Sequence, residues 1–460
     1  MLQTKVFQFC RSLYGVRCEL SRRWSSQHHI LGAKTVDTGG CLEVQHPHWP
    51  HSLRVTYPWL RDHCRCDQCF NHVTVQRKFD LGTLKHNIRP AAVNSTPKEL
   101  EVTWPDGHKS KYDYQFLWQN TFEGRRTSYK SPRLFWTPST FPEPDLTTVP
   151  LSALESSDKN GIQKLLYSIL RHGFGFISEV PPDIESTRLA VEKVCAVQKT
   201  FYGEMWEMQG TNLPHYDTAY TSEYIGPHTD QTYFSSAARI QVFHCLQPAL
   251  EGGGETLLVD GFNVAQKYKE KYPQGYDFLS STAFPAQYKE EGQQHASLDT
   301  VFKHNPVTGN LQQFRFNVYD RAPLSSIPME KMQDFYLHFS NLVKTVQNPR
   351  NEHWLQLQPG MVLLIDNWRI MHGRNKFSGM RIMCGCYFDN DDFSSAARSF
   401  SLQSPVLQEA FEPSQFVAHC VHPSFHPSTA TVQASLVTVC SDKSEDLKKH
   451  HKKEAKEDKH

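Results

Sequence analysis

The stretch Ser222-Glu-Tyr-Ile-Gly-Pro-His-Thr-Asp-Gln-Thr-Tyr-Phe234 places a histidine and a carboxylate two residues apart, at His228 and Asp230. Side chains at i and i+2 of a β-strand point to the same side, so both can reach one metal ion. The triplet alone is weak support, because about one His-x-Asp is expected by chance among 24 histidines. The chain has a second triplet, His215-Tyr-Asp217. The strand-forming Thr-Tyr-Phe after Asp230 favours the His228 triplet, whereas His215 follows Pro214 in a polar, loop-like stretch.

A third ligand is expected late in the same region, on a neighbouring strand. His372 meets this expectation, because it follows the apolar, strand-like run 361–368. Two histidines and one carboxylate make the face with which non-haem Fe(II) oxygenases hold their iron. Taken alone, His372 is better explained as an ordinary buried histidine at a strand end, so other features of the chain must decide.

A cationic side chain follows in the next strand-like run. Arg381 lies within residues 380–387, where its side chain can point inward. A buried guanidinium is unfavourable unless it is paired, and its planar fork matches a carboxylate with two hydrogen bonds. Arg381 therefore suits a dicarboxylate cosubstrate, and an internal salt bridge explains it equally well.

The bulk composition narrows the class of protein. At 460 residues the chain has room for roughly two to three domains, and its net charge of +1 gives no basic field for nucleic acid. It contains no run of about 18 apolar residues, so no membrane span is predicted. Twelve cysteines are too sparse for a disulfide scaffold in a chain of this length.

Residues 1–30 have the composition of a mitochondrial presequence. Arg11, Arg17, Arg22 and Arg23 stand against a single acid, Glu19, and serines follow them. A disordered basic N-terminus without a targeting role is the alternative. In either case the segment is left out of the predicted fold.

Residues 35–140 consist of short alternating runs broken by turns, which predicts a small, mostly β domain. Within it Cys64, Cys66 and Cys69 cluster on a short loop, and His108 lies in a later turn. Three thiols and one imidazole match a closed tetrahedral zinc site, for which we predict a structural role. Unrelated surface thiols are the alternative.

Residues 146–397 begin with two helical patterns, 161–170 and 184–200, on either side of a short strand. Strand-like runs follow at 239–246, 255–260, 311–317 and 361–368, with a helix at 329–347 before the last run. Strands without regular βα alternation favour an antiparallel sandwich or jelly roll over a doubly wound sheet. The pattern ends near Ala397, so residues 398–460 are predicted to be an atypical, disordered tail. A metal-binding function of its Lys- and His-rich end is the alternative.

Four stretches together resemble a known family: Trp59-Leu-Arg-Asp-His-Cys-Arg-Cys-Asp-Gln-Cys69, Gly226-Pro-His-Thr-Asp230, Gly253-Gly-Glu-Thr-Leu-Leu-Val-Asp-Gly-Phe-Asn263 and Asp366-Asn-Trp-Arg-Ile-Met-His-Gly-Arg374. In this combination, residues 40–397 resemble the gamma-butyrobetaine hydroxylase / trimethyllysine dioxygenase family of 2-oxoglutarate-dependent Fe(II) oxygenases. The resemblance implies a mainly β fold with flanking helices. Its parts would be a double-stranded β-helix (jelly-roll) catalytic core and the small N-terminal β domain with the zinc site.

The resemblance also implies a role for each candidate residue of the core. The iron ligands would be His228, Asp230 and His372. Arg381 would bind the far carboxylate of 2-oxoglutarate, assisted by Thr256 or Arg374, and ascorbate would keep the iron reduced. From the same family we expect a homodimer in the mitochondrial matrix.

Four aromatic residues match the positions at which the family encloses a trimethylammonium group: Tyr202, Trp206, Tyr220 and Tyr387. Tyr202 and Trp206 are one helical turn apart, so the sequence predicts that they share a face. Without the resemblance these side chains would be assigned to the core. Cation–π attraction contributes about 0.5–2 kcal/mol per ring, depending on desolvation.

Asp217 favours trimethyllysine over gamma-butyrobetaine as the substrate. A carboxylate there, where the butyrobetaine branch has an amide, suits an α-ammonium group and repels a bare carboxylate. Asn317 is a second candidate contact. The expected reaction hydroxylates N6,N6,N6-trimethyl-L-lysine at C3 with O2 and 2-oxoglutarate, giving succinate and CO2, the first step of carnitine biosynthesis. Gamma-butyrobetaine hydroxylation and a catalytically dead, zinc-carrying jelly-roll binding module are the alternatives.

Overall fold

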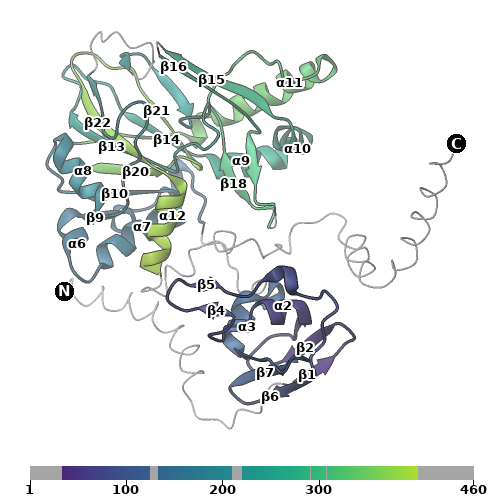
Figure 1. Cartoon of the computed structure of the whole chain (residues 1–460). Coiled ribbons are helices and arrows are strands. Elements are labelled where there is room, and N and C mark those ends of the chain that lie inside the picture. The colour runs from purple at the N-terminus through teal and green to yellow at the C-terminus, as the bar shows by residue number, and fades with distance from the viewer. Residues whose placement is uncertain (1–33, 125–132, 210–219, 291, 307, 402–460) are drawn as a thin grey trace. The chain divides into compact units, whose positions relative to one another are not determined.

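The computed structural model describes residues 34–124, 133–209, 220–290, 292–306 and 308–401. The predicted presequence, the triplet His215-Tyr-Asp217 and the tail beyond Ser401 lie outside these described residues. The chain divides into two compact units, Met1–Ser128 and Tyr129–His460 (Figure 1). Each unit has its own hydrophobic core.

The first unit is a small β domain, as predicted. Two three-stranded antiparallel sheets have the orders β1-β2-β3 and β6-β7-β8. Their strands are β1 (Lys34–Asp37), β2 (Cys41–Gln45), β3 (Leu53–Thr56), β6 (Ala92–Ser95), β7 (Glu99–Thr103) and β8 (Lys109–Asp113). The hairpin of β4 (Phe70–Asn71) and β5 (Gln76–Arg77), the helices α2 (Tyr57–Asp62) and α3 (Tyr114–Asn120), and the turn η1 (Leu81–Thr83) complete it.

The alternating strand sequence and a helix cap explain how this unit folds locally. In β3, Leu53 and Val55 are buried while the residues between and after them are exposed. The exposed Thr56 caps α2, because its side chain accepts a hydrogen bond from the backbone N–H of Trp59. Pro58 occupies the first turn of α2, where a proline is tolerated. The helix ends at Asp62 and delivers the chain to the cysteine loop.

The second unit is a jelly roll made of two sheets, as predicted. The larger sheet has the order β11-β22-β13-β20-β10-β9, and the smaller sheet has the order β12-β21-β14-β19. The larger sheet comprises β11 (Trp206–Gln209), β22 (Ile382–Phe388), β13 (Ile240–Gln247), β20 (Val362–Asp366), β10 (Phe174–Ser178) and β9 (Thr148–Pro150). The smaller sheet comprises β12 (Ile225–His228), β21 (Ile370–Arg374), β14 (Thr256–Asp260) and β19 (His353–Leu355).

Strand β20 shows why the larger sheet is apolar on both faces. Leu363 and Ile365 belong to a core shared with the smaller sheet, whereas Val362 and Leu364 belong to a core shared with helices. Those helices are α6 (Leu151–Glu155), α7 (Asn160–His172), α8 (Ile184–Glu192) and α12 (Asn390–Ser401), and Figure 1 shows α6 and α7 beside β9 and β10. A strand that is buried on both faces reads as a continuous apolar run, which is how it appears in the sequence.

A second group of helices covers the smaller sheet. Side chains of β14 pack with α9 (Gly261–Lys271), α10 (Pro273–Ser281) and α11 (Met329–Val346) in one core. Two hairpins accompany them, β15 (Phe284–Glu290) with β16 (Gln293–Asp299), and β17 (Phe302–His304) with β18 (Leu311–Phe314). The short elements α5 (Pro144–Thr147), η2 (Pro138–Thr140) and η4 (Pro349–Asn351) lie in connections. Among the helices of the described residues, none has the length and apolarity needed to cross a bilayer.

Three predicted boundaries differ from the structure. The helix predicted over 184–200 ends at Glu192, because the following chain runs along the sheet, where Gln198 N–H donates to the carbonyl of Tyr387. The segment after 133, predicted to close the first domain, belongs to the second unit, since Trp136 donates from its backbone to Asp260 and from its indole to the carbonyl of His172. Helix α12 extends to Ser401, beyond the predicted start of the tail at 398.

Candidate active site

Three potential metal ligands converge in the jelly roll. The Nε2 atom of His228 lies 3.2 Å from Oδ1 of Asp230, and the Nε2 atom of His372 lies 3.6 Å from the same oxygen. Metal–ligand bonds of about 2.1 Å at right angles would separate the ligand atoms by about 3.0 Å. Both histidines are buried and Asp230 is half-buried. The three side chains therefore fit a single ion held from one side.

Strand register brings the two histidines together. Strand β12 pairs antiparallel with β21, and His228 lies directly opposite His372. Their ring centroids are 4.3 Å apart. His372 is the central residue of β21, a strand that neighbours β12 as expected from the sequence. Each histidine thus rests on a hydrogen-bonded strand, which limits its movement.

Asp230 reaches the site from a turn. Strand β12 ends at His228, so the prediction that both members of the triplet lie on one strand is wrong. Gln231 has a φ of 61°, an uncommon value for a residue with a side chain, and the chain turns there. Asn367 holds the turn by accepting a hydrogen bond from the N–H of Asp230 at 2.8 Å and donating to its carbonyl at 3.1 Å.

Two of the three ligands favour the unprotonated form that binds a cation. Nδ1 of His228 donates to the carbonyl of Gly226 at 2.9 Å, which leaves Nε2 facing Asp230. Burial, with the repulsion of His228, lowers the pKa of His372 to about 3. Burial alone would raise the pKa of Asp230, but His372, His228 and Tyr387 outweigh it and hold that pKa well below its usual range. Burial alone would lower the pKa of His228, but the neighbouring Asp230 outweighs burial and raises that pKa. A cation bound at this site would displace the extra proton of His228.

Arg381 is a buried cation without a carboxylate partner among the described residues. It directly precedes β22, and its side chain is almost fully buried. Its guanidinium carbon lies 5.6 Å from the centre of the Phe377 ring, and burial lowers its pKa. The internal salt bridge that would have explained this residue is therefore not formed within the described part of the chain.

A glycine leaves the space that Arg381 occupies. A Cβ added at Gly254, whose φ is +78°, would lie 3.1 Å from both Cδ and Nε of the arginine. Thr256 follows at the start of β14 and lies opposite Arg374 of β21. Nη2 of Arg374 donates to the carbonyls of Thr221 and Glu223 at 2.5 and 2.9 Å, which ties down the segment before β12. The assistance of Thr256 or Arg374 to Arg381 stays a prediction.

A hollow adjoins two of the three ligands. His228 and Asp230 form part of its wall. Five of the six predicted substrate residues also line it: Tyr202, Trp206, Tyr220, Asn317 and Tyr387. The sixth, Asp217, lies outside the described residues. The structure therefore gathers side chains from five separate segments beside the metal ligands.

Tyr202 and Trp206 reach the hollow without a helix, so their predicted helical face is wrong. Tyr202 lies in the turn between Thr200 and Gly203, which pair with each other. Trp206 opens the edge strand β11 and pairs with Gly385 of β22. Pairing with the sheet overrides the helical spacing, and the two rings still line one cavity.

Several lining residues were not predicted from the sequence: Met208, Ile225, Gln231, Tyr233, Tyr319 and Asp320. The hydroxyl of Tyr233 lies 3.1 Å from that of Tyr202, and Asn317 donates to the carboxylate of Asp320 at 2.7 Å. Tyr233 and Asp320 each lie three residues from a predicted site residue, so neighbourhood in the sequence was a usable signal. The hydrogen bonds depend on how distant loops meet, for which the sequence offered no signal.

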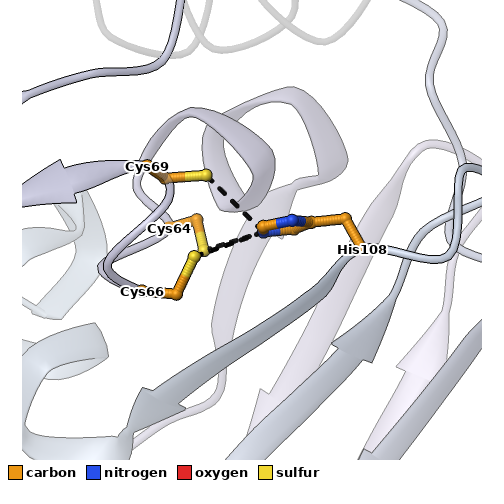
Figure 2. A group of neighbouring side chains, drawn as sticks. All are labelled: Cys64, Cys66, Cys69 and His108. Atoms are coloured by element: carbon orange, nitrogen blue, oxygen red, sulfur yellow. Dashed lines mark hydrogen bonds between the residues drawn. The ribbon is translucent and has the colours of Figure 1, made fainter.

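A second candidate metal centre lies in the first unit (Figure 2). The thiols of Cys64, Cys66 and Cys69 gather at one ring nitrogen of His108, with Sγ–Nε2 distances of 3.3, 3.6 and 3.5 Å. Zinc bonds of about 2.3 Å to sulfur and 2.0–2.1 Å to nitrogen, at tetrahedral angles, would give about 3.5 Å. The group therefore fits one tetrahedral ion, and the alternative of unrelated surface thiols does not describe it.

Local structure holds these four ligands in place. The carbonyl of Cys66 accepts hydrogen bonds from the N–H groups of Cys69 and Phe70, which closes the cysteine loop. His108 follows Gly107, whose φ of +83° makes the tight turn between β7 and β8. Burial raises the pKa of Cys64 to about 11, so its thiolate form requires a cation nearby.

The chain resembles known dioxygenases over most of its length. Residues 137–387 match the model of the taurine catabolism dioxygenase TauD, TfdA family. Residues 37–118 match the model of the gamma-butyrobetaine hydroxylase-like N-terminal domain. These two ranges fall within the second and first units respectively.

Curated dioxygenases are among the proteins to which the chain is similar. The chain is 38% identical over 358 residues to the mitochondrial trimethyllysine dioxygenase of Homo sapiens, covering 76% of this chain and 84% of that protein. It is 26% identical over 381 residues to the human gamma-butyrobetaine dioxygenase, covering 80% and 96%. A solved taurine dioxygenase structure from Burkholderia xenovorans aligns with a TM-score of 0.42 at 13% identity, covering 56% and 94%.

Proposed function

We propose that this chain, which belongs to the TauD/TfdA dioxygenase family and to its trimethyllysine dioxygenase branch, hydroxylates N6,N6,N6-trimethyl-L-lysine at C3. It is a 2-oxoglutarate-dependent dioxygenase. In the proposed reaction, trimethyllysine, O2 and 2-oxoglutarate give 3-hydroxytrimethyllysine, succinate and CO2. This is the first step of carnitine biosynthesis.

The observation that supports this proposal best is the hollow itself. It joins the convergent set of His228 and Asp230 to a wall of aromatic rings that includes Tyr202, Trp206 and Tyr387. A quaternary ammonium group cannot form hydrogen bonds, and aromatic faces attract it through their quadrupole. A trimethylammonium held by these rings would place the substrate chain beside the metal ligands.

The residues of the site divide the remaining work. Nε2 of His228, Oδ1 of Asp230 and Nε2 of His372 would hold Fe(II). The bound ion would supply the O2 chemistry that couples decarboxylation of 2-oxoglutarate to hydroxylation of a C–H bond. Arg381 would pair with the far carboxylate of 2-oxoglutarate, and the buried strands β12 and β21 exclude bulk water from the ligands.

Charge in the hollow supports trimethyllysine over gamma-butyrobetaine. Asp320 contributes a carboxylate to the wall, and Asn317 donates to it. A carboxylate attracts the α-ammonium group that trimethyllysine has and gamma-butyrobetaine lacks. Asp217, outside the described residues, remains our predicted partner of the same group.

Release of labelled CO2 from 1-labelled 2-oxoglutarate tests the proposal. We expect release to depend on trimethyllysine and to be lost in His228→Ala. Faster release with gamma-butyrobetaine would favour the hydroxylase alternative. No stimulation by either compound, in protein that binds Fe(II) and 2-oxoglutarate, would favour the inactive binding module.

Further parts of the proposal concern the rest of the protein. Zinc bound by the three cysteines and His108 would have a structural role, because nothing in that cluster offers an open coordination position. Ascorbate would keep the iron reduced. The mitochondrial names of the animal relatives and the basic segment 1–30 support a mitochondrial location, which we place in the matrix, and a homodimer is the expected assembly.

A further inference from the structure

The two carboxylate oxygens of Asp230 have different surroundings. Oδ1 faces Nε2 of His228 at 3.2 Å and Nε2 of His372 at 3.6 Å. Oδ2 accepts a hydrogen bond from Nε2 of Gln241 at 2.5 Å and another from the hydroxyl of Tyr387 at 2.8 Å. One oxygen therefore points to the candidate metal position, and the other is held by two donors.

The two donors come from one place in the larger sheet. Gln241 of β13 and Tyr387 of β22 are directly opposite each other in the antiparallel pair. Their side chains are 1% and 4% exposed, so little water competes with them for the carboxylate. Because the two donors occupy opposite positions on buried strands, the distance between them is fixed. At that distance both can donate to one oxygen atom, Oδ2 of Asp230.

The amide of Gln241 has only one favourable orientation. An ionised carboxylate accepts hydrogen bonds and donates none, so the NH2 group must face Asp230. The opposite atom, Oε1, is buried and has no hydrogen-bond partner among the described residues. A buried carbonyl without a donor is unfavourable, so the contact with Asp230 is made at the expense of the other end of the amide. Such a local cost is typical of a side chain with a functional role.

We propose that Gln241 and Tyr387 are positioning residues that make Asp230 a one-oxygen metal ligand. Held on Oδ2, the carboxylate cannot rotate to offer both oxygens, and the coordination positions that 2-oxoglutarate and O2 require stay open. The ring of Tyr387 also lines the substrate hollow, so this one residue links the hollow to a metal ligand. The inference rests on the proposed metal site and extends it to two residues outside the ligand set.

Binding of Co(II) to the metal-free protein tests this inference without any turnover. The variants are Tyr387→Phe, which removes one hydroxyl and keeps the ring, and Gln241→Leu, which removes the amide. We expect each to weaken Co(II) binding by about 10- to 100-fold in calorimetry, as loss of a hydrogen bond to a metal ligand commonly does. In the double variant, Oδ2 is no longer held and can also bind the metal. The visible spectrum of bound Co(II) should therefore change in the direction that indicates a higher coordination number.

Tyr202→Phe is the matched control. It removes a hydroxyl from the same hollow, but that hydroxyl lies beside Tyr233 at 3.1 Å and not beside Asp230. We expect its Co(II) affinity to equal that of the wild type. The inference is overturned if Tyr387→Phe binds Co(II) as the wild type does, or if Tyr202→Phe loses as much affinity.

Misfolding of a variant and failure of the proposed function can each be told apart from failure of the positioning role. If Gln241→Leu fails to fold, as judged by its thermal unfolding without metal, the comparison of Tyr387→Phe with Tyr202→Phe decides the matter alone. Suppose that the Co(II) affinities of the wild type and the variants follow the predicted order while the wild type does not hydroxylate trimethyllysine. In that case the proposed function fails and the positioning role stands.

Discussion

Two buried arginines of the second unit have opposite surroundings. Arg369 is 1% exposed and donates to both carboxylate oxygens of Asp260, at 3.1 and 2.8 Å. It also donates to the carbonyls of Leu134 and Arg171, so it joins four segments. Arg381 is 7% exposed and has no ionic partner among the residues that the structure describes. A buried charge without a partner opposes folding, which is the reason to assign Arg381 to a ligand.

Replacing Arg381 by methionine should therefore separate binding from stability. The affinity for 2-oxoglutarate should fall by about 30-fold or more, and 30-fold corresponds to about 2 kcal/mol. Anaerobic calorimetry on Mn(II)-loaded protein measures this affinity. The free energy of unfolding of the metal-free variant should stay the same or rise, because an unpaired buried charge is removed.

Arg369→Met is the contrasting variant. It should lower the free energy of unfolding by about 3–5 kcal/mol, because it leaves Asp260 buried without its partner. If Arg381→Met were destabilised to the same degree, Arg381 would be a structural residue and its assignment to 2-oxoglutarate would be wrong.

At the scale of single elements, strand β22 connects packing to the hollow. Its Cys386 and Phe388 belong to the core shared with the helices, and its Met383 and Tyr387 belong to the core between the sheets. Gly385 lies between these, where the ring of Trp206 packs on it. The absence of a side chain at Gly385 gives the edge strand β11 room for its tryptophan.

We predict that Gly385→Ala disturbs both stability and substrate binding. The added Cβ would lie 2.0 Å from the carbonyl oxygen of Val242 and 2.3 Å from Cζ2 of Trp206, so a strand or the ring must move. Overpacking of this kind costs about 1–3 kcal/mol of unfolding free energy. The KM for trimethyllysine should rise in steady-state assays. An unchanged KM would show that Trp206 is not part of the substrate site.

A hydrogen-bonded histidine ties strand β13 to helix α8. His244 is 0% exposed, its Nε2 accepts from the N–H of Gly360 at 3.1 Å, and its Nδ1 lies 2.7 Å from the hydroxyl of Thr187. The ring is therefore neutral, with its proton on Nδ1. Burial lowers the pKa of His244 to about 4, although the charge of Asp183 opposes the shift.

This histidine predicts a loss of stability in mild acid. In the unfolded chain its pKa is about 6.5, so the unfolded state binds more protons between about pH 6.5 and 4. Stability should fall as the pH is lowered through that range, by on the order of 3 kcal/mol for the full shift. Urea unfolding of the metal-free protein at pH 7, 5.5 and 4.5 measures the loss. His244→Gln should show a shallower dependence, and an equal dependence would assign the loss to other groups.

At the scale of the whole molecule, two units with separate cores hold the two candidate metal centres. The first unit buries a cluster that includes Leu60, Val102 and Trp104, and its four metal ligands lie next to this cluster in the sequence. The second unit holds His228, Asp230 and His372. Since each core is contained within one unit, removal of one metal should affect one unit's unfolding.

We predict that a zinc chelator destabilises the first unit. Structural zinc sites contribute directly to folding free energy, so the transition of this unit should move to lower temperature in calorimetry, and Cys66→Ser should reproduce the shift. Elemental analysis should find one zinc per chain. Because a chelator also removes iron, the control is His228→Ala, in which the same transition should still respond. If neither the chelator nor Cys66→Ser changed the unfolding temperature of the first unit, a structural zinc would be excluded.

Residue types and short spacings determined a large part of this protein. The His228 triplet and the cysteine loop with His108 stood out because metal chemistry admits few side chains, and the resemblance to the family selected His372 and Arg381. Apolar runs without βα alternation predicted an antiparallel sandwich or jelly roll, and the resemblance to the family selected the jelly roll. These signals are local, and they are present in the chain before it folds.

The tertiary structure alone decided which distant side chains meet. The pairing of His228 with His372 depends on the register between β12 and β21, and the contact of Gln241 and Tyr387 with Asp230 depends on a turn meeting two strands of the other sheet. Trp206 faces the hollow because an edge strand paired where the spacing suggested a helix. Register and packing are settled by contacts across many residues of chain, so no local pattern contains them.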